Sequence, residues 1–109
     1  MILATTETIP GQSIQEVKGV VFGDVVLGAN FIKDFFGRLT DTIGGRSRGY
    51  ESVFRDGRVM ATDLMVKSAE KLGADAIVGI DFKFQTMGTN NTILQVSVHG
   101  TAVKLQRTK

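Results

Sequence analysis

The sequence predicts an α+β domain in which an antiparallel sheet is covered on one face by a long helix that a shorter helix precedes. Three observations favour this two-layer class. Strand-like segments lie at both ends of the chain, helix-like segments lie between them, and the last third alternates apolar with polar residues. With 42% hydrophobic and 22% charged residues, the 109-residue chain has the composition of one globular domain over 1–109. We expect its end, 104–109, to be a basic, frayed tail.

The first two strands are predicted from short β-favouring segments separated by a turn. Residues 1–6 form the first segment, which ends before the turn signal Pro10-Gly11. A second strand runs from Ser13 to Phe22, and Gly19 interrupts its alternation at the position expected for a bulge. The segment 25–27 either extends this strand or continues it after a break.

Two helices are expected next. Apolar residues recur at spacings of three and four over 31–43, directly after Asn30, a suitable N-cap. The pair Gly44-Gly45 ends this shorter helix. Ser47 is the expected N-cap of the longer helix, and Gly73 ends it in the left-handed conformation that helix termini commonly need.

The longer helix carries one apolar stripe. Gly57 lies within the stripe, where glycine costs about 1 kcal/mol relative to alanine, and it indicates close approach by the sheet or by the first helix. Met60 and Met65 are interpreted as gap-filling residues of the same stripe. The stripe as a whole consists of Tyr50, Val53, Phe54, Gly57, Met60, Ala61, Leu64, Met65, Ser68, Ala69 and Leu72.

The last third of the chain predicts a β-hairpin with one apolar and one polar face. From Ala76 to Phe84 every second residue is apolar, and after a Gly/Asn-rich loop the pattern returns from Leu94 to Ala102. A slip of two residues between the strands would keep both faces, whereas a slip of one would not. A loop centred on Thr89 pairs Phe82 with Val96, Asp81 with Ser97 and Gly79 with His99.

Composition excludes several chemistries. The chain contains no cysteine, which removes disulfides and thiolate sites and agrees with a cytoplasmic location. No apolar run is long enough to span a bilayer, and the first residues do not have the pattern of a secretory leader, so we expect no membrane partner. A net charge of +2 with 7% aromatic residues is too weak a pattern for a nucleic-acid binder, and that partner is not expected either.

Three segments, Gly44-Gly45-Arg46-Ser47, Leu72 to Gly79 and Val96 to Val103, occur in an order that resembles the YbjQ-like bacterial family, which is described as heavy-metal-binding. The likeness extends from about Ile2 to Lys104. It implies a dodecin-like subunit and a ring-shaped homopentamer in which short extra strands join neighbours, and it implies little about activity. If residues 1–6 form such a strand, trimming them weakens assembly more than it weakens the subunit's fold.

The family's description points to a metal, but this chain lacks the thiolates that hold soft metals. His99 is the one histidine, and a closed zinc site needs four ligands. A ring axis that gathers His99 from each subunit, with Asp81 beside it, is the one arrangement that supplies enough ligands. We therefore expect no metal site within a subunit and no cofactor.

The turn before the longer helix is the candidate site for a small anionic ligand. Gly45, Arg46, Ser47 and Arg48 would offer backbone N–H groups, the positive end of a helix and two guanidinium groups to a phosphate or a carboxylate. The turn lacks the Gly-x4-Gly-Lys-Ser/Thr pattern of a nucleotide-hydrolysing P-loop. A structural turn between two helices explains the glycines equally well.

Ser97, His99 and Asp81 share the polar face of the hairpin and nominally provide a nucleophile, a base and an orienting acid. No nucleophile elbow or oxyanion loop accompanies them, and Asp75 is interpreted as a turn-capping residue, so we assign no catalytic residue. We expect a non-enzymatic module that assembles with itself and binds a small ligand, a metal or a partner. The alternatives are a small enzyme with a site between subunits and a ring that binds nucleic acid weakly.

Overall fold

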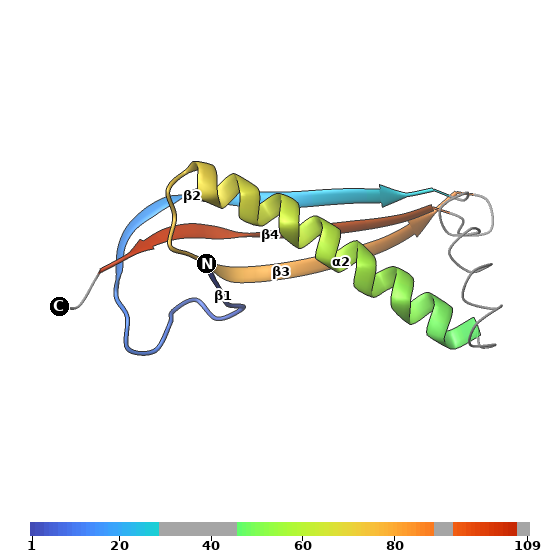
Figure 1. Cartoon of the computed structure of the whole chain (residues 1–109), viewed down its shortest axis with the longest axis horizontal. Helices are drawn as coiled ribbons and strands as arrows, with labels where there is room; N and C mark the ends of the chain where they lie inside the picture. Colours follow the sequence, from blue (N-terminus) through green and yellow to red (C-terminus); the bar gives the residue numbers. More distant parts are fainter. Residues whose placement is uncertain (29–45, 89–92, 107–109) are drawn as a thin grey trace.

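The computed structural model describes residues 1–28, 46–88 and 93–106, with the backbone alone described over 46–51. One helix, α2 (Arg46–Lys71), packs on one face of a four-stranded sheet (Figure 1). The strands are β1 (Ile2–Leu3), β2 (Ile14–Leu27), β3 (Ala76–Met87) and β4 (Ile93–Leu105). The expected α+β class is confirmed, and the expected shorter helix over 31–43 lies outside the described residues.

The sheet is mixed rather than antiparallel, which corrects the expected topology. In the strand order β1-β3-β4-β2, β4 runs antiparallel to both of its neighbours, whereas β1 runs parallel to β3. Backbone hydrogen bonds continue this parallel contact beyond β1: the Ala4 N–H donates to the Ile77 carbonyl at 2.9 Å, and the Gly79 N–H donates to the Thr6 carbonyl at 2.8 Å. The segment 1–6 therefore adds to the sheet of its own subunit.

The helix crosses the sheet diagonally, from β2 at its C-terminal end towards β3 in its N-terminal half (Figure 1). The approach is close because glycines stand at the contact. A Cβ on Gly57 would lie 2.7 Å from the Val96 Cγ2, and a Cβ on Gly23 would overlap the Ala61 carbonyl. The expectation that Gly57 marks close approach by the sheet is confirmed. The buried row of α2 advances four residues at a time: Val53, Gly57, Ala61, Met65 and Ala69.

The neighbouring row of α2 is exposed. Met60, Leu64 and Leu72 are exposed although their spacing places them in the same apolar stripe as the buried row. Successive residues of an α-helix are about 100° apart around its axis, so a stripe two rows wide cannot turn both rows towards one flat sheet. The interpretation of Met65 as a core residue is confirmed, and that of Met60 is wrong.

A bulge interrupts β3 at Gly79. Val78 pairs with Thr101 and Asp81 pairs with His99, so two residues of β3 stand opposite one residue of β4. Gly79 has a φ of 63°, a left-handed conformation that glycine adopts without the cost of a Cβ clash. The bulge reverses which side chains of β3 point towards α2.

The reversal produces two cores. Ile77 and Ile80 belong to the main core between the sheet and α2, whereas the residues on either side of Ile77 point to the opposite face. The expectation that Ala76 and Val78 share a face with Ile80 is therefore wrong. The small second core contains Ala76, Val78, Val103 and Leu105, with Ile9 packed against it.

After the bulge, from Ile80 onward, the β3–β4 hairpin has the expected faces but a different register. Phe82 pairs with Val98 rather than Val96, and Asp81 pairs with His99 rather than Ser97. This is the slip of two residues that leaves both faces unchanged. β4 also extends through the buried Leu105, so this part of the expected tail belongs to the sheet.

Among the remaining local expectations, those at Gly73 and Gly19 are confirmed and the one at Ser47 is wrong. Gly73 has a φ of 73° and follows the end of α2, as expected for a helix C-terminus. The β2–β4 register shifts between Val17 and Gly19, as expected for a bulge, and β2 continues to Leu27 as one strand. α2 begins at Arg46, so Ser47 lies inside the helix rather than at its N-cap.

The molecule is elongated. Its principal extents are 54 × 26 × 20 Å and its radius of gyration is 17.0 Å, against about 13 Å for a compact domain of this length. The segment around Ile9 covers one end of the second face at the small second core. The long sheet leaves the rest of this face and most of both edges without a covering element among the described residues.

Candidate functional site

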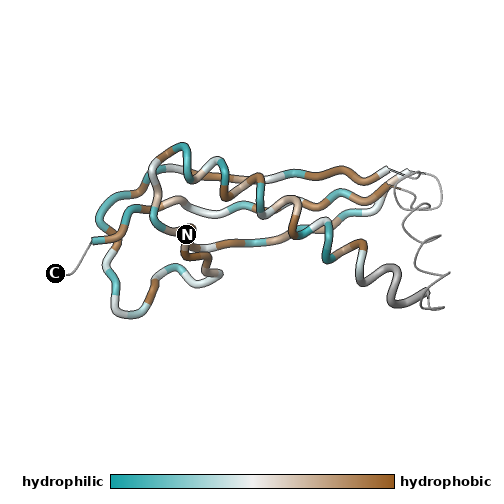
Figure 2. Tube along the Cα trace, in the orientation of Figure 1, coloured by the Kyte–Doolittle hydropathy of each residue, from teal (hydrophilic) through white to brown (hydrophobic). Residues whose placement is uncertain are grey.

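The face of the sheet away from α2 carries exposed apolar side chains. Val21 lies in the main core and Gly23 lies against α2, so the alternate residues of β2 point the other way. Among them, Val20 is 70% exposed and Phe22 is 62% exposed. Figure 2 shows β2 as brown, that is apolar, over much of its later half. We call Val17, Val20, Phe22 and Val26, all of which are exposed, the β2 apolar row.

The β2 apolar row lies on an edge of the sheet. In the described part of the chain β2 has one hydrogen-bonded neighbour, β4, so its outer edge is open. Sheet edges of soluble proteins usually carry charges that prevent pairing with other chains. From Gly19 to Gly23, β2 has no charged residue, and Asp24 is a charged residue on the same face, between Phe22 and Val26. An exposed edge with four large apolar side chains and one carboxylate is typical of a surface that another chain covers.

The exposed row of α2 adjoins this edge near the end of the helix. A hollow of about 270 Å³ lies between the end of the helix and β2. Leu72 lies close to the sheet there: a Cβ placed on Gly19 would be 3.7 Å from the Leu72 Cδ1. The apolar edge therefore continues from the strand to Leu72, directly after α2, and Ser68 and Lys71 contribute polar side chains to the hollow. The hollow is lined by Val20, Val21, Phe22, Ser68, Lys71 and Leu72.

His99, Ser97 and Asp81 meet on the open face, as expected. The observed register places Asp81 directly across from His99 and places Lys83 across from Ser97. Asp81 and His99 are exposed, and no hydrogen bond joins these three side chains within the residues that the structure describes. No group of three or more histidine, aspartate or glutamate side chains in the described ranges could hold a metal ion. The arrangement is that of a solvated sheet surface.

The candidate anion site lies partly outside the described residues. Arg46, Ser47 and Arg48 belong to the first turn of α2, which contains no acidic residue, and Gly45 precedes the described segment. No acidic side chain of this turn therefore balances the partial positive charge at the N-terminus of the helix. The anion site remains a prediction, because the structure does not describe these side chains.

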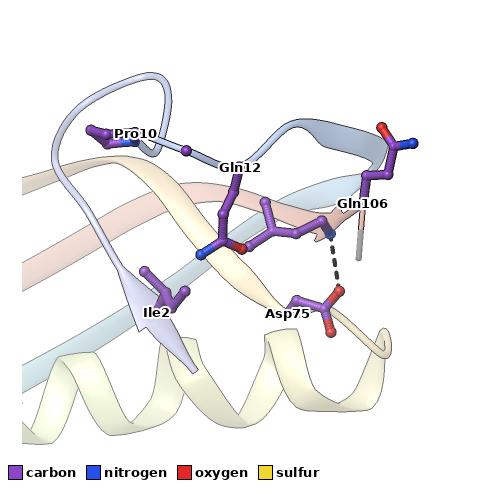
Figure 3. Close-up of a pocket in the computed structure, with 7 residues that line it drawn as sticks. Ile2, Pro10, Gln12, Asp75 and Gln106 are labelled. Carbon is purple, nitrogen blue, oxygen red and sulfur yellow. Dashed lines mark hydrogen bonds between the residues drawn. The ribbon is translucent and has the colours of Figure 1, made fainter. Parts of the chain in front are cut away.

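A hollow of about 580 Å³ lies where β1 meets the start of β3 and the end of β4 (Figure 3). The Leu105 N–H donates to the Asp75 Oδ2 at 3.0 Å, so this carboxylate joins two strands instead of capping its own turn. The expected turn at Pro10-Gly11 forms part of the wall, and its Gln12 N–H donates to the Ile9 carbonyl at 3.1 Å. Sequence reasoning missed this hollow because its lining comes from distant segments: Ile2, Pro10, Gly11, Gln12, Asp75, Leu105 and Gln106.

A further hollow of about 370 Å³ lies between α2 and β3, lined by Phe54, Arg55, Arg58 and Phe84. The rings of Phe54 and Phe84 meet edge to face, with their centroids 5.4 Å apart. The sequence pattern places both phenylalanines on apolar faces and gives neither arginine a role. The helical spacing of Phe54 and Arg58 was the available signal, but their contact with β3 depends on tertiary packing.

Together these features define a small α+β domain whose sheet is covered by a helix on one side and is mostly open on the other. Residues 1–106 match the YbjQ family, described as "Putative heavy-metal-binding", and the chain belongs to this family. The resemblance noted in the three sequence motifs is thereby confirmed. Among the described residues, no helix combines the length and the hydropathy needed to cross a membrane.

A crystal structure from Pediococcus pentosaceus is similar in fold. It contains a protein of unknown function that belongs to the DUF74 family, and it aligns with 97% of this chain and 98% of its own, with a TM-score of 0.61 and 18% sequence identity. At this identity the likeness supports the fold alone. It extends over nearly the full length of both chains, so the elongated two-layer arrangement is shared as a whole.

Proposed function

We propose that this protein is a non-enzymatic module that assembles with copies of itself and binds a small ligand, a metal or a partner. The family resemblance implies a ring of five dodecin-like subunits and a bacterial protein. The absence of cysteine agrees with a cytoplasmic location, and the proposal includes all three. The β2 apolar row is the observation that carries it. Four large apolar side chains lie exposed on one open edge of the sheet, where burial against a second copy would stabilise an assembly.

The expected gain is substantial for so small a subunit. Fully burying a large apolar side chain contributes about 1.5–3 kcal/mol, and the row contains Val17, Val20, Phe22 and Val26. The open backbone edge of β2 adds N–H and C=O groups that a strand of another copy can pair with. A ring also removes the exposed edges that a single elongated sheet presents.

Sedimentation velocity of the full chain tests this proposal. A lysine at the centre of the row, Val20→Lys, should convert the assembly into smaller species, because association would bury its charge. Val59→Lys is the matched control, since Val59 is also an exposed valine, at 54% exposure, but lies on the helix. We expect this control to sediment like the wild type.

Two results would contradict the proposal. A wild-type protein that sediments as an 11.8 kDa monomer at micromolar concentration would exclude self-assembly. An assembly that dissociates in Val59→Lys but not in Val20→Lys would show that the interface lies on the helix and not at the β2 edge.

A metal role is the second candidate, because Asp81 stands directly across from His99 and a ring would repeat this pair around its axis. One imidazole and one carboxylate do not complete a zinc site, so we predict no tight binding of mercury-, cadmium- or zinc-class ions by an isolated subunit. Calorimetry with Zn²⁺ checks this on the assembled protein and on the Val20→Lys species. A sub-micromolar site in the dissociated species, lost in His99→Ala, would contradict the prediction, and a site in the ring alone would support the axis.

A further inference from the structure

The hollow between α2 and β3 brings two guanidinium groups to an aromatic pair. Arg55 and Arg58 are exposed and stand three residues apart on the helix, a spacing at which side chains lie side by side. Phe84, from β3, is 42% exposed and presents part of its ring to the same hollow. Its edge-to-face contact with the half-buried Phe54 holds the aromatic wall in place.

The charge of this hollow is not neutralised within the described part of the chain. The one ion pair there joins Lys18 to Glu16, at 3.2 Å on β2. Asp56, which lies between the two arginines in sequence, pairs with neither of them among the described residues. Among the described side chains, neither guanidinium group has a carboxylate partner. We take both groups to be available to an anion, and guanidinium recognises phosphate and carboxylate by paired hydrogen bonds.

The aromatic wall restricts the class of anion. A bare inorganic anion makes no use of an exposed phenylalanine ring, whereas a ligand with a flat aromatic ring gains from stacking on Phe84 and on the guanidinium planes. The volume of about 370 Å³ lies near the lower end of the range for small-molecule pockets, about 300–1,000 Å³. That volume suits one ring system with one acidic group.

We propose that the hollow formed by Phe54, Arg55, Arg58 and Phe84 binds a small aromatic anion of the nucleoside monophosphate type. The inference rests on the proposed function, since it names the class of small ligand that the module would take. The arginines bind the phosphate, and the aromatic wall binds the base. The site lies beside β3, across the sheet from the β2 apolar row, so binding and assembly use different surfaces.

Calorimetric titration of the full chain with adenosine 5′-monophosphate tests the proposal. Replacing Arg55 and Arg58 together by glutamine should weaken binding by about tenfold or more, and so should Phe84→Leu, which removes the ring. The control replaces Lys67 and Lys104 by glutamine, because Lys67 is exposed on the same helix, Lys104 lies on β4, and neither lines this hollow. It removes the same charge and should change the affinity by less than about threefold.

Two further titrations separate the halves of the ligand. Adenosine alone and inorganic phosphate alone should each bind at least about tenfold more weakly than the nucleotide. Phosphate that binds as tightly as the nucleotide would overturn the aromatic part of the proposal. Equal losses of nucleotide affinity in the arginine variant and in the lysine control would show that binding depends only on the overall charge of the protein. This result would also overturn the proposal.

Sedimentation of the same variants keeps this proposal distinct from the proposed assembly. The arginine variant should sediment like the wild type while it loses nucleotide binding. Assembled protein that shows no heat of binding at millimolar nucleotide would overturn the ligand and leave the assembly standing. A variant that loses nucleotide binding and falls apart would assign Arg55 and Arg58 to a subunit contact, which also overturns the site.

Discussion

The two faces of this sheet are built from the same strands but are packed very differently. Under α2, Val96 and Val98 are almost completely buried, and glycines let the helix backbone approach the strands. On the other face, Val20 and Phe22 of the neighbouring strand are more than 60% exposed. The stability of the subunit therefore depends mainly on one face, and the other face is free to bind. Substitutions on the two faces should differ accordingly.

The largest loss of stability is expected where an added side chain has no space on the face packed against α2. In Gly23→Ala, the added Cβ would overlap the Ala61 carbonyl, and helix backbone cannot move aside as a flexible side chain can. Overpacking of this kind costs about 3 kcal/mol. Chemical denaturation at one fixed protein concentration measures the loss, since the concentration affects the apparent stability of an assembly.

Gly28→Ala is the matched control for this substitution. Gly28 follows β2, and a Cβ there would meet no atom within 4 Å, so the change should stay within about 0.5 kcal/mol. Similar costs at the two glycines would show that the contrast between packed and open positions is wrong.

An intermediate effect is expected at the β1 edge of the sheet. Deleting residues 1–6 removes four backbone hydrogen bonds, among them those from Ile2 to the Asp75 carbonyl and from Ala4 to the Ile77 carbonyl. Each contributes about 0.5–1.5 kcal/mol, partly offset by the chain entropy that the deletion avoids, and we expect a net loss of about 2 kcal/mol. The segment pairs within its own subunit, so the fold should weaken more than the assembly.

This order reverses the expectation from the family resemblance, in which trimming 1–6 acts mainly on assembly. Unfolding and sedimentation of the shortened chain decide between them. A shortened protein that keeps the wild-type unfolding midpoint but sediments as smaller species would show that the segment joins neighbours.

The difference between the faces also explains what the sequence could predict. The alternation from Leu94 to Ala102 and the position of Gly57 depend on the face under α2, where burial is strict, and both were predicted correctly. The register of the hairpin was missed by two residues, because such a slip leaves every side chain on the same face. Hydrophobic pattern alone contains no information that separates these registers.

Other features depend on contacts between distant segments. The bulge at Gly79 follows from its left-handed φ of 63°, and β1 is too short for its parallel pairing with β3 to leave a pattern. Met60 and Met65 have the same helical period, and only the position of the sheet decides which of them is buried. The hollow at Phe54 and Phe84 could not be predicted for the same reason, since it joins a helix to a strand.

A smaller effect is expected at Asp75, which joins β3 to β4 outside the main core. Asp75→Ala removes the acceptor of the Leu105 N–H, a hydrogen bond of 3.0 Å in a half-buried position. An unsatisfied donor there should cost about 1–2 kcal/mol. Asp75→Asn keeps an acceptor oxygen and should recover most of this loss in thermal unfolding. Equal losses in the two variants would contradict the hydrogen-bond explanation.

The smallest effect on stability is expected at the start of α2, where the candidate anion site lies. Replacing Arg46 and Arg48 together by glutamine should change the free energy of unfolding by no more than about 0.5 kcal/mol, as for typical surface substitutions. This expectation treats the turn as structural, with the open positive end of the helix as its one attractive feature for an anion.

Phosphate or sulfate added during thermal unfolding sharpens this last prediction. An anion that binds the folded state at this turn would raise the melting temperature of the wild type in a saturable way, and the rise would largely disappear in the double variant. General salt effects raise the melting temperatures of the wild type and of the double variant equally. We expect the equal rise, because Arg55 and Arg58, which form no ion pair with any described side chain, lie further along the helix beside the aromatic wall. A saturable rise confined to the wild type would instead place a second anion site at the first turn of α2.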